Sequence, residues 1–281
     1  MVQIRELQQF VEFEQCVELQ RIIWGFDDRD LIPARMMTTV QQHAGFVAGA
    51  FEGERVVGFL FAVPSIHDNR CAQHSQMLGI LEEYRDRGFG RMLKLAQYVD
   101  AQTRGISLIT WTFDPLEARN AFLNLNRLGA ISQTYYVNLY GERTSSDLHS
   151  GLGTDRFLAE WRIGGTRVER ILSGTDPTPP KHAELPRVLS WNKGSRFLPA
   201  EAQLNRMELQ LLAEVPPDTQ RLKQLDRQGA VRWREVTRVL FQHYFDRGYW
   251  IKALVRSDEV LPLPNYDFRR TFFLLEPFAD N

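Results

Sequence analysis

The stretch from Arg85 to Gly90 has the residue types and spacing best suited to binding chemistry in this sequence. Its pattern is Arg-x-x-Gly-x-Gly, and its residues are Arg85, Asp86, Arg87, Gly88, Phe89 and Gly90, with Arg91 next. Glycines let a backbone approach a ligand closely and turn tightly into a helix. The first amides of a helix lack internal acceptors, and the helix dipole and nearby arginines favour an anion with several oxygens. The pattern therefore predicts a diphosphate site.

The hexapeptide also has a plainer interpretation as a chance pattern. Such a pattern arises in on the order of one chain in ten of this length, because glycine is common. Glu82, Glu83 and Asp86 also balance the charge of the neighbouring arginines. The context supports a site, because a predicted strand precedes the motif, an amphipathic helix follows it, and a second strand and helix lie directly downstream.

The elements that position this motif follow from the spacing of apolar residues. Continuous or alternating apolar runs predict strands at 45–51, 56–63, 75–81, 107–113, 132–140 and 156–163. Helical spacing predicts helices over 5–24 and 88–104, with Lys94 turned away from the core, and a further helix that ends at Gly129. Asp114 and Pro115 suit the N-cap and first turn of that further helix. Residues 52–55 have hairpin length, and 65–73 are predicted to form a polar loop.

This order of elements predicts a mixed α/β fold, a mixed sheet with helices on both faces. The stretch 173–180, rich in Pro, Gly, Ser and Thr, is the strongest linker candidate. We therefore expect one domain over 1–164 and a second, smaller α/β region over 165–281. Strands are predicted near 187–191, 207–215, 249–256 and 271–276, with helices near 218–228 and 230–246. Their order resembles that of 107–163, which suggests a degenerate copy of that half.

Composition restricts the possible classes of protein. The chain has 281 residues, a formal charge of −1, 43% hydrophobic and 25% charged residues, as in ordinary globular proteins. This balance indicates no nucleic-acid or membrane partner, and the start of the chain has no signal-peptide pattern. Cys16 and Cys71 are too few for a disulfide framework or a multi-cysteine metal site. We expect a cytoplasmic protein without a bound metal.

A dinucleotide site is one alternative for the glycine motif. It requires a parallel crossover and an acidic residue after the second strand, and Asp114 lies near that spacing. Dinucleotide-binding domains usually begin with their glycine motif, whereas a helix and a hairpin are predicted to precede it here. The order of elements therefore favours a different diphosphate ligand.

Residues 1–163 resemble the GNAT acyltransferase family, and the likeness is best over 78–130. The family motif Gln/Arg-x-x-Gly-x-Gly/Ala, between a bulged strand and a helix, is matched without a gap by residues 78–91. The resemblance implies acetyl-CoA or another acyl-CoA as co-substrate. It implies that the strand end holds the pantetheine arm between splayed strands 75–81 and 107–113, and that amides over 87–91 hold the pyrophosphate. The strand-end residues are Leu78, Gly79, Ile80 and Leu81.

The helix that ends at Gly129 resembles the second signature of the family less closely. Asn120 is the candidate for the asparagine of this signature, which the resemblance implies to contact the cofactor. An ungapped count places that position at Ala118. The tyrosine that many members use as general acid falls on Leu125, so this role cannot be transferred to the chain.

Other residues are therefore needed for proton transfer and for binding the acceptor. Asp114 and His74 lie at ends of the two predicted parallel strands, and each could act as a base. Tyr135 is a candidate proton donor. Trp24 and Asp28 belong to a loop that overhangs the acceptor site in the family. Each also has a plainer interpretation: Asp114 as an N-cap, His74 as a solvated histidine and Tyr135 as a core residue. The loop with Trp24 and Asp28 could be a plain solvated turn.

Two further runs, 119–130 and 153–161, resemble a bacterial GNAT subgroup with an additional C-terminal half. That resemblance implies amino acids as acceptors and succinyl as a possible acyl group. The expected activity is transfer of an acetyl or other short acyl group to a small amine or amino acid by direct attack. The alternatives are a bulkier donor, as in amino-acid N-succinyltransferases, and a non-catalytic CoA-binding module. Residues after 165 could complete the acceptor pocket or form a homodimer contact.

Overall fold

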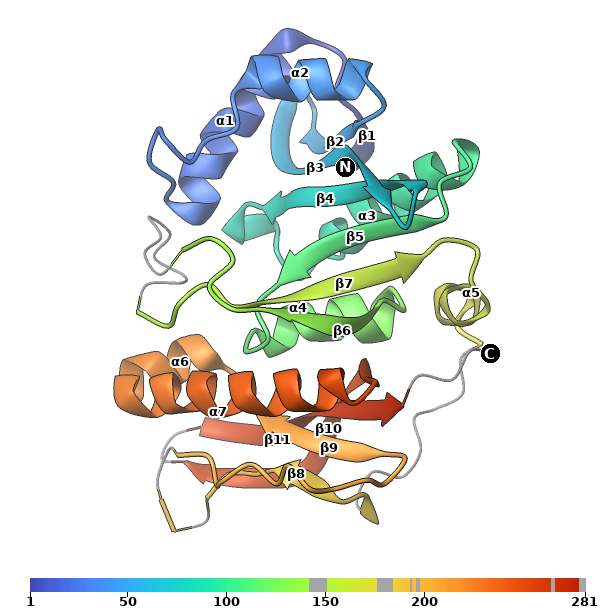
Figure 1. Cartoon of the computed structure of the whole chain (residues 1–281). Coiled ribbons are helices and arrows are strands. Elements are labelled where there is room, and N and C mark those ends of the chain that lie inside the picture. The colour runs from blue at the N-terminus through green and yellow to red at the C-terminus, as the bar shows by residue number, and fades with distance from the viewer. Residues whose placement is uncertain (142–150, 176–183, 193, 196–197, 264–265, 278–281) are drawn as a thin grey trace. The chain divides into compact units, whose positions relative to one another are not determined.

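The computed structural model describes residues 1–141, 151–175, 184–192, 194–195, 198–263 and 266–277 (Figure 1). Contacts within the chain divide it into two compact units. The described part of the first unit comprises 1–111 and 160–166, and the second comprises 112–141, 151–159 and the described chain after 166. The division runs through two strands. The predicted boundary between independent domains at 164–165 stays a prediction.

The sheet of the first unit has the order β1-β2-β3-β4-β5. Neighbouring strands pair antiparallel except β4 and β5, which are parallel. The strands are β1 (Val2–Glu6), β2 (Phe46–Glu52), β3 (Arg55–His67), β4 (Arg70–Ile80) and β5 (Leu108–Phe113). Gly53, at φ 62°, forms the turn between β2 and β3 as predicted.

Helices cover both faces of this sheet. They are α1 (Phe10–Trp24), α2 (Ala34–Gln42), the 3₁₀ turn η1 (Glu82–Tyr84) and α3 (Phe89–Thr103). A Cβ at Gly79 would lie 2.6 Å from Trp24 of α1, whereas the adjacent Leu78 lies beside Gly90 of α3. Since successive strand residues point to opposite faces, α1 and α3 lie on opposite sides of β4. The mixed sheet with helices on both faces confirms the predicted fold class.

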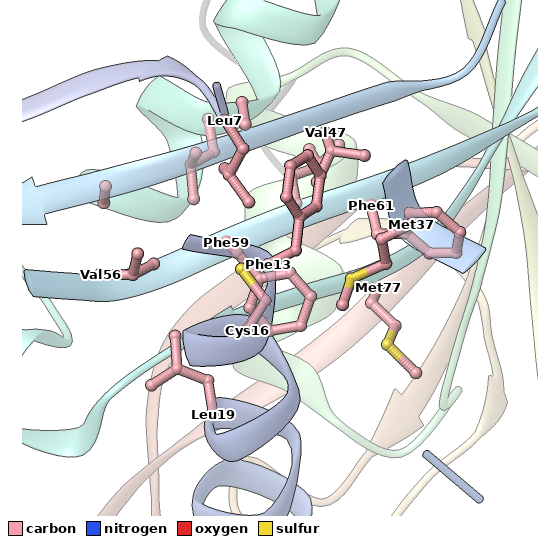
Figure 2. Packing of buried hydrophobic residues seen from close by; sticks show 14 of the residues in the cluster. Leu7, Phe13, Cys16, Leu19, Met37, Val47, Val56, Phe59, Phe61 and Met77 are labelled. Atoms are coloured by element: carbon pink, nitrogen blue, oxygen red, sulfur yellow. The ribbon is translucent and has the colours of Figure 1, made fainter. Parts of the chain in front are cut away.

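The core of the first unit lies between the helices and the sheet. Figure 2 shows Phe13, Cys16 and Leu19 of α1 packed with Met37 of α2 against strand residues such as Phe59. These α1 residues are spaced three apart, so they share one face of the helix. Burying this apolar face, at roughly 25 cal/mol per Å², fixes the helix on the sheet.

Two predictions for the N-terminal part were wrong. Residues 2–6 form β1, and the helix begins at Phe10, because the Glu12 carboxylate accepts the amides of Gln8 and Gln9 at 2.7 and 3.2 Å and stops the helix there. The predicted polar loop over 65–73 is a hairpin between β3 and β4. Asp68 and Asn69 form its turn with φ of 47° and 58°, values that Asp and Asn tolerate.

The second unit contains a second sheet with the order β6-β10-β11-β9-β8. Its strands, together with β7, are β6 (Ile131–Tyr136), β7 (Arg156–Arg162), β8 (Arg187–Leu189), β9 (Leu211–Val215), β10 (Tyr249–Leu263) and β11 (Tyr266–Pro277). Its helices are α4 (Ala118–Phe122), the π-helical turn η2 (Leu123–Arg127), α5 (Thr166–Ser173), α6 (Thr219–Leu225) and α7 (Arg227–Asp246). Asp226 begins α7 by accepting the amide of Gly229 at 2.9 Å. The linker candidate after Ser173 falls mainly on 176–180, outside the described residues.

The strand order of the second unit repeats a motif of the first half of the chain. A strand, a helix and two strands give the order β5-β7-β6 in one copy and β9-β11-β10 in the other. In each copy the first strand also has a parallel neighbour, β4 or β8. The topology therefore supports the predicted degenerate copy. None of the described residues between β8 and β9 forms a counterpart of α3.

Among the described residues, no helix combines the length and the apolar character needed to cross a bilayer.

Candidate functional site

The glycine motif forms an exposed turn that leads into α3. Asp86 and Gly88 both have positive φ, 62° and 83°, and Gly88 is the N-cap of the helix. The first internal helical hydrogen bond runs from the Met92 amide to the Gly88 carbonyl at 3.0 Å. The amides of residues 89–91 therefore precede the internal ladder and are available to an external acceptor. This is the geometry that favours an anion with several oxygens.

The space around the two glycines is open. A Cβ added at Gly88 would meet no atom within 4 Å, and one at Gly90 would reach only Leu78, at 4.0 Å. Glycine is needed at residue 88 for its left-handed backbone and not because the protein crowds it. A side chain at either position would therefore extend into open space among the described residues.

The arginines of the motif are held by their neighbours. Nε of Arg85 donates to the carbonyl of Ile80 at 3.2 Å, and the Arg87 guanidinium lies 5.3 Å from the centre of the Tyr84 ring. The Tyr84 hydroxyl donates in turn to Glu52 at 2.5 Å. These contacts attach the turn to the sheet while both guanidinium groups remain at the surface.

Strand β4 carries a bulge just before the predicted pantetheine residues. The ladder to β3 pairs Phe61 with Met77 but Ala62 with Ser75, so Gln76 is the extra residue. The parallel ladder to β5 pairs Gln73 with Ile109 and His74 with Thr110, and no further pair joins the two strands in the part of the chain that the structure describes. The edge of β4 from the bulge to Ile80 is therefore free of this ladder, as expected for splayed strands.

Trp24, predicted as an acceptor-site residue, lies against this strand. Its ring stacks on Phe26 with centroids 5.6 Å apart and covers Gly79, where a Cβ would meet it at 2.6 Å. Gly79 is thus required for the close approach of Trp24. Asp28 lies in the exposed turn that follows α1 and pairs with Arg21 at 2.8 Å. The structure therefore brings Trp24, but not the Asp28 carboxylate, into contact with β4.

His74 ends the short ladder between β4 and β5. Its Nδ1 lies 2.9 Å from the Thr110 hydroxyl, and its side chain is half-buried. Burial, reinforced by the charge of Lys94, lowers the pKa of His74 below its ordinary value. The imidazole is therefore neutral near pH 7 and can accept a proton.

Asp114 is not the N-cap of α4, so that prediction was wrong. Glu117 holds this place, while Asp114 accepts the Leu116 amide at 2.8 Å and both of its oxygens bind Nη2 of Arg234 at 2.6 and 2.7 Å. Burial alone would raise the pKa of Asp114, but the charges of Arg234 and Arg156 outweigh it and hold the pKa below the ordinary value. An ion-paired carboxylate of this kind is a weak base.

Tyr135 is engaged with a second buried carboxylate. Its hydroxyl donates to Asp155 at 2.6 Å, and Asp155 also accepts two hydrogen bonds from Arg238 at 2.8 and 2.9 Å. Burial and the neighbouring Asp155 charge raise the pKa of Tyr135. Asp114 and Tyr135 therefore belong to a charged network of the second unit, and their catalytic roles stay predictions.

The residues compared with the second signature lie in α4 and η2. Asn120 is exposed, Ala118 is buried, and Leu125 is fully buried in η2. A contact between Asn120 and a cofactor therefore stays a prediction. A leucine in the core supplies no proton, so Leu125 cannot act as a general acid.

Sequence reasoning missed the burial of Lys94. This residue was expected on the outer face of α3, but its Nζ lies 3.7 Å from the Trp111 ring centre and 5.9 Å from that of Trp161. Gln97 accepts its hydrogen bond at 3.2 Å, and burial lowers its pKa well below the ordinary value. Helical periodicity could not indicate this, because the two rings come from strands distant in sequence.

Comparisons with known proteins give structural neighbours only. No protein-family model matches the chain, and no curated protein matches it. A structure from Desulfovibrio desulfuricans, described as a GNAT-family acetyltransferase, is 12% identical, covers 58% of this chain and 100% of its own, and has a TM-score of 0.47. The ribosomal-protein-S18-alanine N-acetyltransferase of Escherichia coli is 14% identical, with 59% and 96% covered and a TM-score of 0.46. NAA60 of Arabidopsis thaliana, in complex with acetyl-CoA, is 14% identical, with 58% and 100% covered and a TM-score of 0.47.

Proposed function

We propose that the chain is a CoA-dependent N-acyltransferase that transfers an acetyl or other short acyl group to a small amine or amino acid. The observation that carries the proposal is the continuous path from β4 to α3. The path begins at a bulged strand whose ladder to β5 stops at His74, and it ends at an open helix start with glycines at 88 and 90. An extended arm with a diphosphate at one end fits both features.

The residues of this path have distinct roles in the proposed site. The amides of 89–91 would bind the pyrophosphate, and Arg85 and Arg87 would add charge at the surface. The free edge of β4 from Leu78 to Ile80 would hydrogen-bond the pantetheine amides as an added strand does, whereas the amide of Leu81 already donates to the Val57 carbonyl at 3.0 Å. Trp24, which covers Gly79, would border the acyl end of this edge.

The reaction needs a base and a place for the developing negative charge. The acceptor nitrogen attacks the thioester carbonyl, the carbonyl oxygen becomes an oxyanion, and the C–S bond then breaks to release the CoA thiolate. Backbone amides of β4 would stabilise the oxyanion. His74 is the best-supported base among the predicted residues, because its imidazole is neutral near pH 7, and it would return the proton to the thiolate.

A non-catalytic CoA-binding module is the second candidate. It is favoured by the buried Leu125, which stands at the position where many GNAT enzymes carry a tyrosine that acts as general acid. The two candidates differ in one measurable property: only the enzyme releases free thiol from acyl-CoA when an acceptor amine is present.

Thermal shift with acetyl-CoA, succinyl-CoA and NAD tests the binding site. We expect stabilisation by a CoA thioester and its loss in Gly90→Glu, because the added carboxylate would repel the pyrophosphate. Gly90→Ala is the matched control, since a Cβ at this position meets only one atom, at 4.0 Å, and should leave binding intact.

Stabilisation by NAD alone, or equal CoA binding by Gly90→Glu and the wild type, would refute the proposed site. Thiol release is then measured over a panel of amines and amino acids. CoA binding without amine-dependent release would exclude the enzyme and leave the binding module.

A further inference from the structure

Three arginines lie along one face of α7 in the second unit. Arg227, Arg234 and Arg238 are separated by seven and four positions, so their side chains point the same way from the helix. The same face borders a cavity of about 290 Å³. Its lining residues are Asn138, Gly151, Leu152, Gly153, Val231, Arg234, Glu235 and Arg238.

Buried carboxylates fix the orientation of two of these guanidinium groups. Arg234 uses Nη2 for Asp114 and Nε for the Leu152 carbonyl, at 3.2 Å. Its Nη1 is buried and has no hydrogen-bond partner among the described residues. Arg238 similarly uses Nε and Nη2 for Asp155. An unsatisfied buried guanidinium donor costs free energy, so its retention beside a cavity suggests a missing acceptor.

Two glycines allow the cavity wall to approach polar side chains. Gly151 and Gly153 have φ of 83° and 73°. A Cβ at Gly153 would lie 2.5 Å from Oδ1 of Asn138, and one at Gly151 would lie 2.2 Å from Nη2 of Arg227. The wall is therefore built from backbone and polar atoms at positions where other residues would be strained and crowded.

Several charged pairs lie at or near the cavity. Asp114, Asp155 and Glu235 are paired with Arg234, Arg238 and Arg232, respectively. Arg156, 3.7 Å from Asp114, and Arg227, beside Gly151, are additional. Arg156 and Arg227 therefore add positive charge near a cavity whose two lining arginines are each matched by a carboxylate, an arrangement that favours an anionic ligand.

We propose that this cavity binds the carboxylate of a small organic acid. Asp114 and Asp155 fix the orientation of the Arg234 and Arg238 guanidinium groups that line the cavity, and a planar carboxylate matches the planar donor geometry of arginine. The site is assembled from residues of the second unit alone, so it does not depend on the proposed acyl-CoA site.

Calorimetric titration of the full chain with succinate, at constant ionic strength, tests this proposal. Succinamide is the neutral probe of the same length, and inorganic phosphate tests the alternative oxyanion. We expect binding of succinate, none of succinamide, and weaker binding of phosphate.

Variants that leave both buried ion pairs intact locate the site. Val231→Glu should weaken succinate binding by at least about tenfold, because it adds a negative charge to the cavity wall. Val231→Gln is the matched control and should bind as the wild type does. Glu235 is exposed, and Glu235→Gln should tighten binding by roughly threefold, because it removes a negative charge at the rim. Gly90→Glu should not change succinate binding.

Equal binding by Val231→Glu and Val231→Gln would overturn the proposal, as would binding of succinamide. Phosphate binding more tightly than succinate would overturn the assigned ligand class. Loss of succinate binding in Gly90→Glu would move the anion site to the glycine motif.

Discussion

The ion pair between Asp114 and Arg234 joins two buried residues that are 120 positions apart in the chain. Both carboxylate oxygens of Asp114 are bound by one guanidinium nitrogen, and Arg156 adds a second positive charge at 3.7 Å. A buried pair stabilises the fold only while both partners are present, because a lone charge cannot be solvated in the interior.

Asp114→Ala should therefore lower the free energy of unfolding by about 3–5 kcal/mol, measured by urea denaturation. The folded-state pKa of Asp114 is lowered, so its contribution is complete above the ordinary carboxylate range. It should be lost as the pH falls through the lowered folded-state pKa. The exposed pair between Asp28 and Arg21 is the control: Asp28→Ala should cost less than about 1 kcal/mol. Similar losses in the two variants would contradict this account.

His74→Gln should lower kcat by about 10²- to 10⁴-fold and leave CoA binding unchanged, if His74 is the base. The wild-type rate should fall with pH only below the ordinary histidine pKa, since burial and Lys94 lower the pKa of His74. The unfolded chain binds this proton more readily, so stability also declines as the pH falls through that range. Steady-state rates across pH test this, with His43→Gln, at an exposed histidine, as the control. An unchanged pH profile in His74→Gln would exclude the role.

At the scale of elements, Trp24 and Ile23 pack the end of α1 against β4 at Gly79. Trp24 packs on the backbone of Gly79 and meets the edge of Phe59, with ring centroids 6.0 Å apart. The contact needs a residue without a side chain on β4, next to the strand edge that is proposed to bind pantetheine. The close packing of the end of α1 on β4 thus depends on Gly79.

Gly79→Ala should cost about 1–3 kcal/mol in unfolding free energy, because its Cβ would lie 2.6 Å from the Trp24 ring. The cost should shrink when Trp24→Leu is combined with it, since the smaller side chain leaves space. A double-mutant cycle by chemical denaturation measures this coupling. Strictly additive costs would show that the two residues do not constrain each other.

At the scale of the whole molecule, the two regions that share a strand order, treated as copies in the prediction, differ in the residues beside their parallel strands. The copy with β4 and β5 has the glycine turn and α3, whereas the chain between β8 and β9 contains one glycine, Gly194, and no Arg-x-x-Gly-x-Gly pattern. A parallel strand pair without the helix start lacks the amides that bind a diphosphate. The second copy therefore resembles the first in strand order but not in binding chemistry.

Equilibrium dialysis should accordingly find one CoA bound per chain, and none in Gly90→Glu. Gly194→Glu, the matched change in the second copy, should still bind one. A stoichiometry of two, or loss of binding in Gly194→Glu, would assign a binding role to the second copy.

The sequence by itself determined what depends on local spacing. The hairpin at Gly53, the turn at Gly88 and the helix that follows it were predicted within a residue or two, because backbone conformation and helical periodicity are properties of neighbouring residues. Only the tertiary structure decided which polar residues are buried together. Lys94 lies over the Trp111 ring and near Trp161, and Asp114 lies against Arg234, because distant strands and helices bring these partners together. Such pairings leave no local pattern, so the sequence predicted the glycine turn but not the arginine-lined cavity beside α7.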